Sequence, residues 1–127
     1  MPLTLQLIPG EFAVCRLPAT APLPAWAGSA VFCSVTRTTD ELSIMCPAPH
    51  VPAGIKHESD WRLLKLQGPF AFTETGILAA VLAPLAAAKI GILATATFDT
   101  DYVLVKAGRL DEACRVLRAA GHTVRDV

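Results

Sequence analysis

Hydrophobic and polar positions in the second half of the chain follow two regular periods. Residues 61–66 alternate between apolar and polar, which is typical of a half-buried strand. Between residues 77 and 88, and again between 109 and 120, apolar positions recur at helical spacing. The predicted elements are a strand at 61–66, a helix at 77–88, strands at 90–97 and 101–106 around a turn at 98–100, a helix at 109–120 and a strand at 122–127.

This order of elements is the split βαβ pattern, which folds into one sheet carrying two helices. The fold class that it predicts is α+β, with a ferredoxin-like (βαββαβ) module. Thr73 or Thr75 is placed to cap the first helix, and Gly121 is placed to end the second. Pro84 lacks a backbone donor, so we expect a kink or the last full turn of the first helix there.

The first half of the chain reads as shorter segments separated by proline and glycine. The predicted elements are strands at 3–8 and 11–17 on either side of a Pro9–Gly10 turn, one helical turn ending at Gly28, a hairpin at 31–37 and 41–45, and a connector at 47–57. With two hairpins and little helix, the first half resembles a degenerate version of the module predicted for the second half. We therefore predict two like modules side by side, a degenerate one at 1–57 and a complete one at 58–127.

The amino-acid composition argues against several classes of function. Hydrophobic residues make up 53% of the 127 positions and charged ones 17%, so the chain folds and has apolar surface to spare for an oligomer interface. Eleven basic residues balance eleven acidic ones, which argues against nucleic-acid binding. The longest apolar run, residues 76–88, is too short to cross a bilayer, and the N-terminus has no signal-peptide pattern. We expect a cytoplasmic protein without a membrane partner.

Four cysteines stand at positions 15, 33, 46 and 114, and none forms a CxxC pair, so the sequence predicts no metal site. If Thr39–Asp40 is a two-residue turn, Cys33 and Cys46 lie directly opposite on paired strands, and a cross-strand disulfide is geometrically feasible. In a reducing cytosol, free thiols are the favoured reading.

Catalytic signatures are missing from the sequence. It contains no GxSxG elbow, no P-loop and no GxGxxG, so we predict neither an enzyme nor a cofactor. His57 with Glu58 and Asp60 is interpreted as a set of solvated polar residues. Asp99 is expected to stabilise its turn, whereas Asp101 at the start of a strand is a candidate for ligand binding.

Several of these segments resemble the ACT domain family. The segments that carry the resemblance are Gly76–Leu85 followed by Ala88–Ile92, Thr97–Val105, Phe32–Thr38 and Glu41–Ile44. The last three are similar to the branch that contains short tandem ACT proteins and amino-acid sensors of the CASTOR type. The resemblance covers nearly the whole chain and is strongest from Trp61 onward.

The resemblance implies a non-catalytic regulatory protein that binds a small molecule, an amino acid above all, where ACT modules meet. It also implies a homodimer or another homo-oligomer and a partner enzyme or regulator. Carried over by motif, the ligand-binding residues are Ser34, Val35, Thr36, Gly76, Ile77, Thr97, Phe98 and Asp101. Free amides at a helix start hold a carboxylate, and a carboxylate such as Asp101 holds an ammonium group.

Two other readings stay open. The first alternative is a structural protein–protein interaction module whose pocket is vestigial. The second is an enzyme that needs a cofactor or a partner-supplied group. Ligand identity is not encoded in any motif of the chain.

Overall fold

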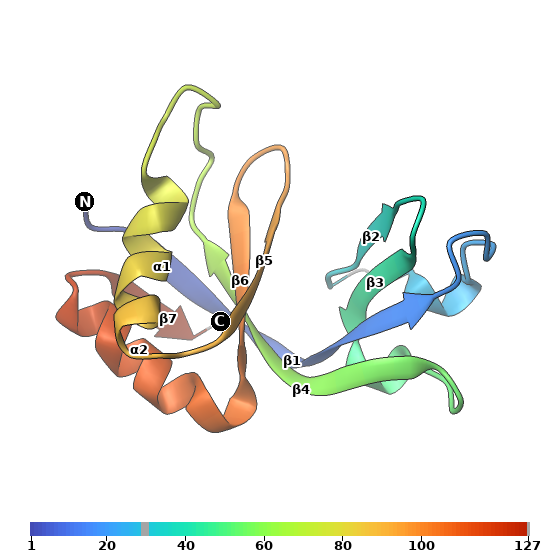
Figure 1. Cartoon of the computed structure of the whole chain (residues 1–127). Helices are drawn as coiled ribbons and strands as arrows, with labels where there is room; N and C mark the ends of the chain where they lie inside the picture. The colour runs from blue at the N-terminus through green and yellow to red at the C-terminus, as the bar shows by residue number, and fades with distance from the viewer. Residues whose placement is uncertain (29–30, 127) are drawn as a thin grey trace. The chain divides into compact units, whose positions relative to one another are not determined.

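The computed structural model describes residues 1–28 and 31–126, which form seven strands and two α-helices (Figure 1). The strands are β1 (Thr4–Leu17), β2 (Ser34–Arg37), β3 (Leu42–Pro47), β4 (Lys56–Leu66), β5 (Ile92–Ala96), β6 (Asp101–Lys106) and β7 (Thr123–Asp126). The helices are α1 (Ile77–Ala87) and α2 (Leu110–Ala119), with single 3₁₀ turns at Ala25–Ala27, Ala48–His50 and Ala107–Arg109. Val127, included in the predicted last strand, lies outside the described residues.

The chain divides into two compact units. Residues 1–9 and 62–127 make up one, called here the helical unit, and residues 10–61 make up the other, called the strand unit. Strands β1 and β4 each contribute residues to both units. The prediction that residues 1–57 are a degenerate second module stays a prediction.

The helical unit confirms the predicted order of elements. From β4 onward the chain runs strand, helix, strand, strand, helix, strand, as a ferredoxin-like module does. Within this unit the sheet order is β7, β1, β4, β6, β5. Strand β5 starts at Ile92 rather than at residue 90. Helix α1 begins where predicted and ends one residue earlier, and α2 is one residue shorter at each end.

The N-terminal strand is an added member of this sheet. Residues Thr4–Leu7 of β1 lie parallel to β7, with Leu5 opposite Val124, and both of these side chains are buried. The sheet of the helical unit thus includes a strand from outside residues 58–127. Alternation of side chains shows that a segment is a strand, but it does not show which strand pairs with it.

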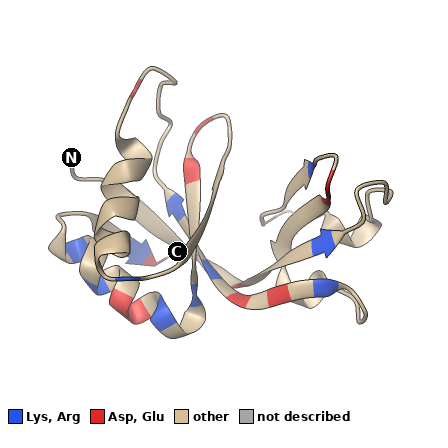
Figure 2. Ribbon diagram, in the orientation of Figure 1, with Lys and Arg blue, Asp and Glu red and all other residues tan. Residues whose placement is uncertain are grey.

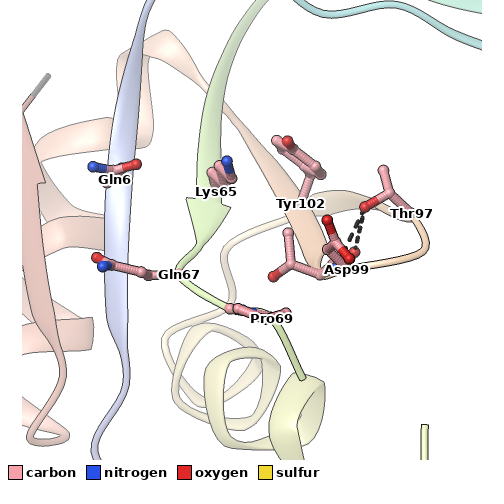
Figure 3. Close-up of a pocket in the computed structure, with 9 residues that line it drawn as sticks. Gln6, Lys65, Gln67, Pro69, Thr97, Asp99 and Tyr102 are labelled. Atoms are coloured by element: carbon pink, nitrogen blue, oxygen red, sulfur yellow. Dashed lines mark hydrogen bonds between the residues drawn. The ribbon is translucent and has the colours of Figure 1, made fainter. Parts of the chain in front are cut away.

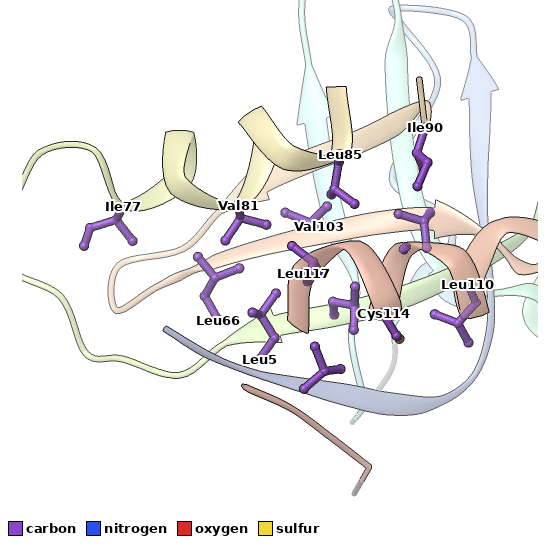
Figure 4. Close-up of a cluster of buried hydrophobic side chains, with 14 residues drawn as sticks. Leu5, Leu66, Ile77, Val81, Leu85, Ile90, Val103, Leu110, Cys114 and Leu117 are labelled. Atoms are coloured by element: carbon purple, nitrogen blue, oxygen red, sulfur yellow. The ribbon is translucent and has the colours of Figure 1, made fainter. Parts of the chain in front are cut away.

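Both helices pack onto the sheet around one hydrophobic core (Figure 4). Val81 and Leu85 of α1 and Leu117 of α2 are fully buried there, as their spacing predicted. They meet Leu66 of β4 and Val103 of β6, which are also fully buried. At about 25 cal/mol for each Å² of apolar surface removed from water, such contacts supply most of the free energy that holds the layers together.

The start of α1 differs from the prediction. Its N-cap residue is Gly76, in the left-handed region with φ 78°, and no side chain caps the helix. Thr73 and Thr75 therefore do not act as caps. The carboxylate of Glu74 instead accepts a hydrogen bond from the Ala71 N–H, at 3.0 Å, inside the preceding loop.

The strand unit is built from the second part of β1 together with β3 and β2 (Figure 1). Its small core contains Leu42 and Ile44, which are fully buried. The predicted turn at Pro9–Gly10 is wrong, because β1 continues through it, with Gly10 at φ 97°. The connector is shorter than predicted, since β4 already begins at Lys56.

Charged side chains of both signs are interspersed on α2 and β4 (Figure 2). The described part of the chain has no helix that is long and apolar enough to cross a membrane. Among the same residues, no group of three or more histidine, cysteine or acidic side chains is arranged to hold a metal ion.

Candidate functional site

The turn between β5 and β6 is fixed by two threonines. The Thr97 N–H donates to the Thr100 carbonyl at 2.8 Å, and the Thr100 N–H donates to Thr97 Oγ1 at 3.3 Å. The Thr100 hydroxyl is buried and donates to the Leu66 carbonyl at the end of β4, at 2.6 Å. These bonds attach the turn to the neighbouring strand, so the side chains between them hold defined positions.

The loop that follows β4 is attached to the same turn. The Phe70 N–H donates to the Asp99 carbonyl at 2.9 Å. Gly68 lies so close that an added Cβ would be 2.9 Å from that same carbonyl oxygen. The loop and the turn therefore form one hydrogen-bonded assembly beside the start of α1.

A cavity of about 210 Å³, called here the helix-side cavity, lies between this loop, the turn and the start of α1. Four of the predicted ligand-binding residues line it, namely Ile77, Thr97, Phe98 and Asp101. Gly76 directly precedes Ile77 as the N-cap of α1. The structure therefore brings four of these residues to one cavity and places Gly76 beside it, and their role in ligand binding stays a prediction.

The helix-side cavity has complementary ends. On one side lies Ile77, the first residue of α1, and the backbone N–H groups of this first turn lack helical partners and a side-chain cap. On the other side Asp99 and Asp101 contribute carboxylates, and Asp101 is half-buried, while Glu74 adds a third carboxylate from the loop just before α1. Such a pair of ends suits a small molecule that carries both a carboxylate and an ammonium group.

Two aromatic rings stand beside this cavity. Phe72 and Phe98 are 76% and 79% exposed, and both line it. Their ring centroids are 5.0 Å apart and the rings are nearly perpendicular, at 80°. Large exposed apolar side chains in contact with each other are typical of binding surfaces.

A second cavity, of about 380 Å³, opens on the sheet face opposite the helices (Figure 3). Gln6, Lys65 and Tyr102 line it from β1, β4 and β6, and each of them alternates with residues of the helix-covered core. Thr97 and Asp99 line both cavities, so the turn is their common wall.

Sequence reasoning missed most of this second cavity. The sequence does contain an indication of this cavity, because polar Gln6 and Lys65 interrupt strongly apolar strand segments. Assigning them to one surface requires the pairing of β1 with β4, which no local pattern gives. Asp99 was assigned only to its turn, yet it lines both cavities.

The remaining predicted residues belong to the strand unit. Ser34, Val35 and Thr36 are consecutive residues of β2 and lie opposite Met45, Ile44 and Ser43 of β3. Val35 and Thr36 are exposed, and Ser34 is half-buried. Their role as part of a ligand site stays a prediction.

Comparison with known proteins identifies the family. Residues 56–119, half of the chain, match the family model of the ACT domain. The chain belongs to the ACT domain family. A second family model, described as an N-terminal domain, matches residues 10–54 of this ACT protein. The search of curated proteins found no match to the chain.

Solved structures resemble this ACT protein along most of its length. An Agobacterium tumefaciens protein is 39% identical, with a TM-score of 0.95 over 100% of this chain and 95% of the other. A Vibrio cholerae protein of unknown function, described as a possible transport protein, is 17% identical, with a TM-score of 0.74 over 93% and 89%.

The regulatory subunit of aspartate kinase from Thermus thermophilus also shares the fold. It is 10% identical, with a TM-score of 0.60 over 87% of this chain and 91% of the other. At such identities the likeness concerns the fold alone. The similarity of this ACT protein to sensors of the CASTOR type stays a prediction.

Proposed function

We propose that this ACT protein is a non-catalytic regulatory protein of the cytoplasm that binds an amino acid in the helix-side cavity. One observation carries the proposal: Ile77, Thr97, Phe98 and Asp101, separated in the sequence, line a single cavity next to the uncapped start of α1. The likeness of its fold to a regulatory subunit of aspartate kinase supports a regulatory role.

The charges of the cavity favour a zwitterion. A ligand carboxylate would accept hydrogen bonds from the amides at the start of α1, where the helix dipole adds a favourable partial charge. A ligand ammonium would pair with Asp101, and a side chain would contact Phe98. Ser34, Val35 and Thr36 are proposed as further ligand contacts.

A thermal-shift screen of the twenty amino acids tests this proposal. We expect at least one of them, at millimolar concentration, to raise the melting temperature. A ligand at a hundred times its Kd adds about 2.7 kcal/mol to the stability of the native state. Asp101→Asn should abolish the shift, whereas Glu11→Gln, an exposed carboxylate outside the helix-side cavity, should preserve it. No shift with any amino acid would contradict the proposal.

The second candidate function is a protein interaction module with a vestigial pocket. The exposed Phe72–Phe98 pair favours it, because such a pair can anchor a partner protein without any small molecule. Under this reading, Asp101→Ala and Gly76→Val leave self-association and partner binding unchanged. Under the amino-acid proposal, both substitutions weaken ligand binding.

A further inference from the structure

Two buried cysteines of the strand unit lie side by side in its core. Strands β1 and β3 pair with Cys46 opposite Ala13 and Cys15 opposite Ile44, so the two cysteines occupy a diagonal position on one sheet face. The proximity of the two thiols contributes to the raised pKa of Cys46, after the larger effect of its burial. Both are almost completely buried and belong to the same apolar cluster.

A third cysteine extends this row to the surface. In the β2–β3 hairpin Ser34 lies opposite Met45, and the same register continued by one residue places Cys33 opposite Cys46. An electrostatic influence of the Cys33 thiol on the pKa of Cys46 agrees with this placement. Cys33 is exposed, whereas Cys46 is buried. The three cysteines therefore extend from the exposed Cys33 to the buried Cys46 and Cys15.

The spacing of opposite residues suits a covalent bond. Directly opposite residues of antiparallel strands have Cα atoms about 4.5–5.5 Å apart. Disulfide bonds join residues whose Cα atoms are about 4.4–6.8 Å apart. With the register of β2 and β3 continued to Cys33, Cys33 and Cys46 meet this backbone requirement.

We propose that Cys33 is an oxidation site, and that a hydroperoxide converts Cys33 and Cys46 into a reversible disulfide. In the first step the Cys33 thiolate attacks the terminal peroxide oxygen, the O–O bond breaks, and a sulfenic acid and an alcohol or water form. In the second step Cys46 loses its proton and its sulfur attacks the Cys33 sulfur. The S–S bond forms, the S–O bond breaks, and hydroxide leaves with that proton as water.

The accessibility and the pKa of the two thiols determine which cysteine reacts first. Cys33 meets the oxidant first because it is accessible. Burial, reinforced by the neighbouring thiols of Cys15 on β1 and of Cys33, raises the pKa of Cys46 to about 11. Because the thiolate is the attacking species, the second step is slow near neutral pH, and its rate should rise about tenfold for each pH unit between about 7 and 9.

Oxidation at Cys33 would affect its surroundings. Cys33 also lines an apolar cavity of about 280 Å³ together with Leu23, Ala27 and Val35. A sulfenic acid places a polar oxygen at this wall, and the disulfide then draws the sulfur toward β3. The modification site thus differs in place and chemistry from the helix-side cavity.

The test uses the full chain with hydrogen peroxide as the oxidant. After a timed exposure, free thiols are alkylated, and peptides are mapped by mass spectrometry without reduction. We expect a peptide pair joined through Cys33 and Cys46, a loss of two hydrogen atoms, and full recovery of both thiols with dithiothreitol. The rate of joining, followed at several pH values, should show the rise given above.

Three variants control the experiment. Cys33→Ser, an exposed change that leaves the core intact, should abolish the crosslink, whereas Cys114→Ser, the buried cysteine of the helical unit, should leave it unchanged. Cys46→Ala should stop the reaction at a sulfenic acid on Cys33, which dimedone traps. Overoxidation of Cys33 with Cys46 still free, a crosslink between two chains, or a Cys15–Cys46 pair would each overturn the proposal.

Discussion

His122 contacts a backbone carbonyl of α1 that Pro84 leaves without its helical hydrogen bond. Pro84 has no N–H to donate to the Ala80 carbonyl, which is its expected partner four residues earlier. His122 Nε2 lies 2.8 Å from that carbonyl oxygen. Because the Leu3 N–H donates to His122 Nδ1 at 3.0 Å, the proton of the neutral ring resides on Nε2 and is donated to Ala80.

Removal of the His122 ring should destabilise the folded protein. His122→Ala removes a buried ring and leaves the partly buried Leu3 N–H and Ala80 carbonyl without these partners, which lowers the free energy of unfolding by about 2–4 kcal/mol. Urea unfolding measures the difference. His50→Ala, at an exposed position, is the matched control and should change stability by less than about 0.5 kcal/mol. Equal stability of the two variants would contradict this role.

At the scale of elements, the loop after β4 and the turn before β6 act together. Their hydrogen bond, from the Phe70 N–H to the Asp99 carbonyl, is made where Gly68 leaves no room for a side chain. The helix-side cavity depends on this contact, because Phe70 and Asp99 both line it.

Gly68→Ala should therefore disturb the site more than the fold. The new Cβ would be 2.9 Å from the Asp99 carbonyl oxygen, so the loop or the turn must move. Overpacking of this kind costs about 1–3 kcal/mol of stability, and we expect ligand-induced thermal shifts to disappear. Gly91→Ala, where nothing lies within 4 Å of the added atom, should behave as the wild type. Unchanged ligand binding by Gly68→Ala would show that the cavity tolerates a displaced loop.

The elements themselves were largely predictable. The spacing of Ile77, Val81 and Leu85 predicted the buried face of α1, and all three are buried. The cap at Gly76 was not predicted, because threonine side chains nearby offered an equally good local solution. The continuous β1 was missed because a Pro–Gly pair usually marks a turn, and the tertiary pairing outweighed that preference.

At the scale of the whole molecule, β5 forms an edge of the sheet. Its five residues, Ile92–Ala96, include no charged residue and no proline, although edge strands usually carry such features to prevent pairing with other chains. If this ACT protein forms the homo-oligomer that its sequence predicts, β5 is a candidate edge for pairing between two copies.

A single charge on this edge tests the association. Ala94→Lys should prevent pairing of β5 with a second copy, so that sedimentation equilibrium reports a monomer where the wild type forms a dimer. Ala83→Lys adds the same charge to an exposed position of α1 and should leave the dimer intact. A monomeric wild type, or a dimeric Ala94→Lys variant, would refute this interface.

The sequence by itself determined the order of elements in residues 61–126 and the residues that α1 and α2 bury, because local periodicity decides both. Its family motif also indicated Ile77, Thr97, Phe98 and Asp101, which the fold does bring to one cavity. Only the tertiary structure decided that β1 lies between β4 and β7, and that Gln6 therefore meets Lys65 and Tyr102 on the open sheet face. Strand pairing is a non-local property, since backbone hydrogen bonds are the same for every residue type and leave no trace in a local pattern.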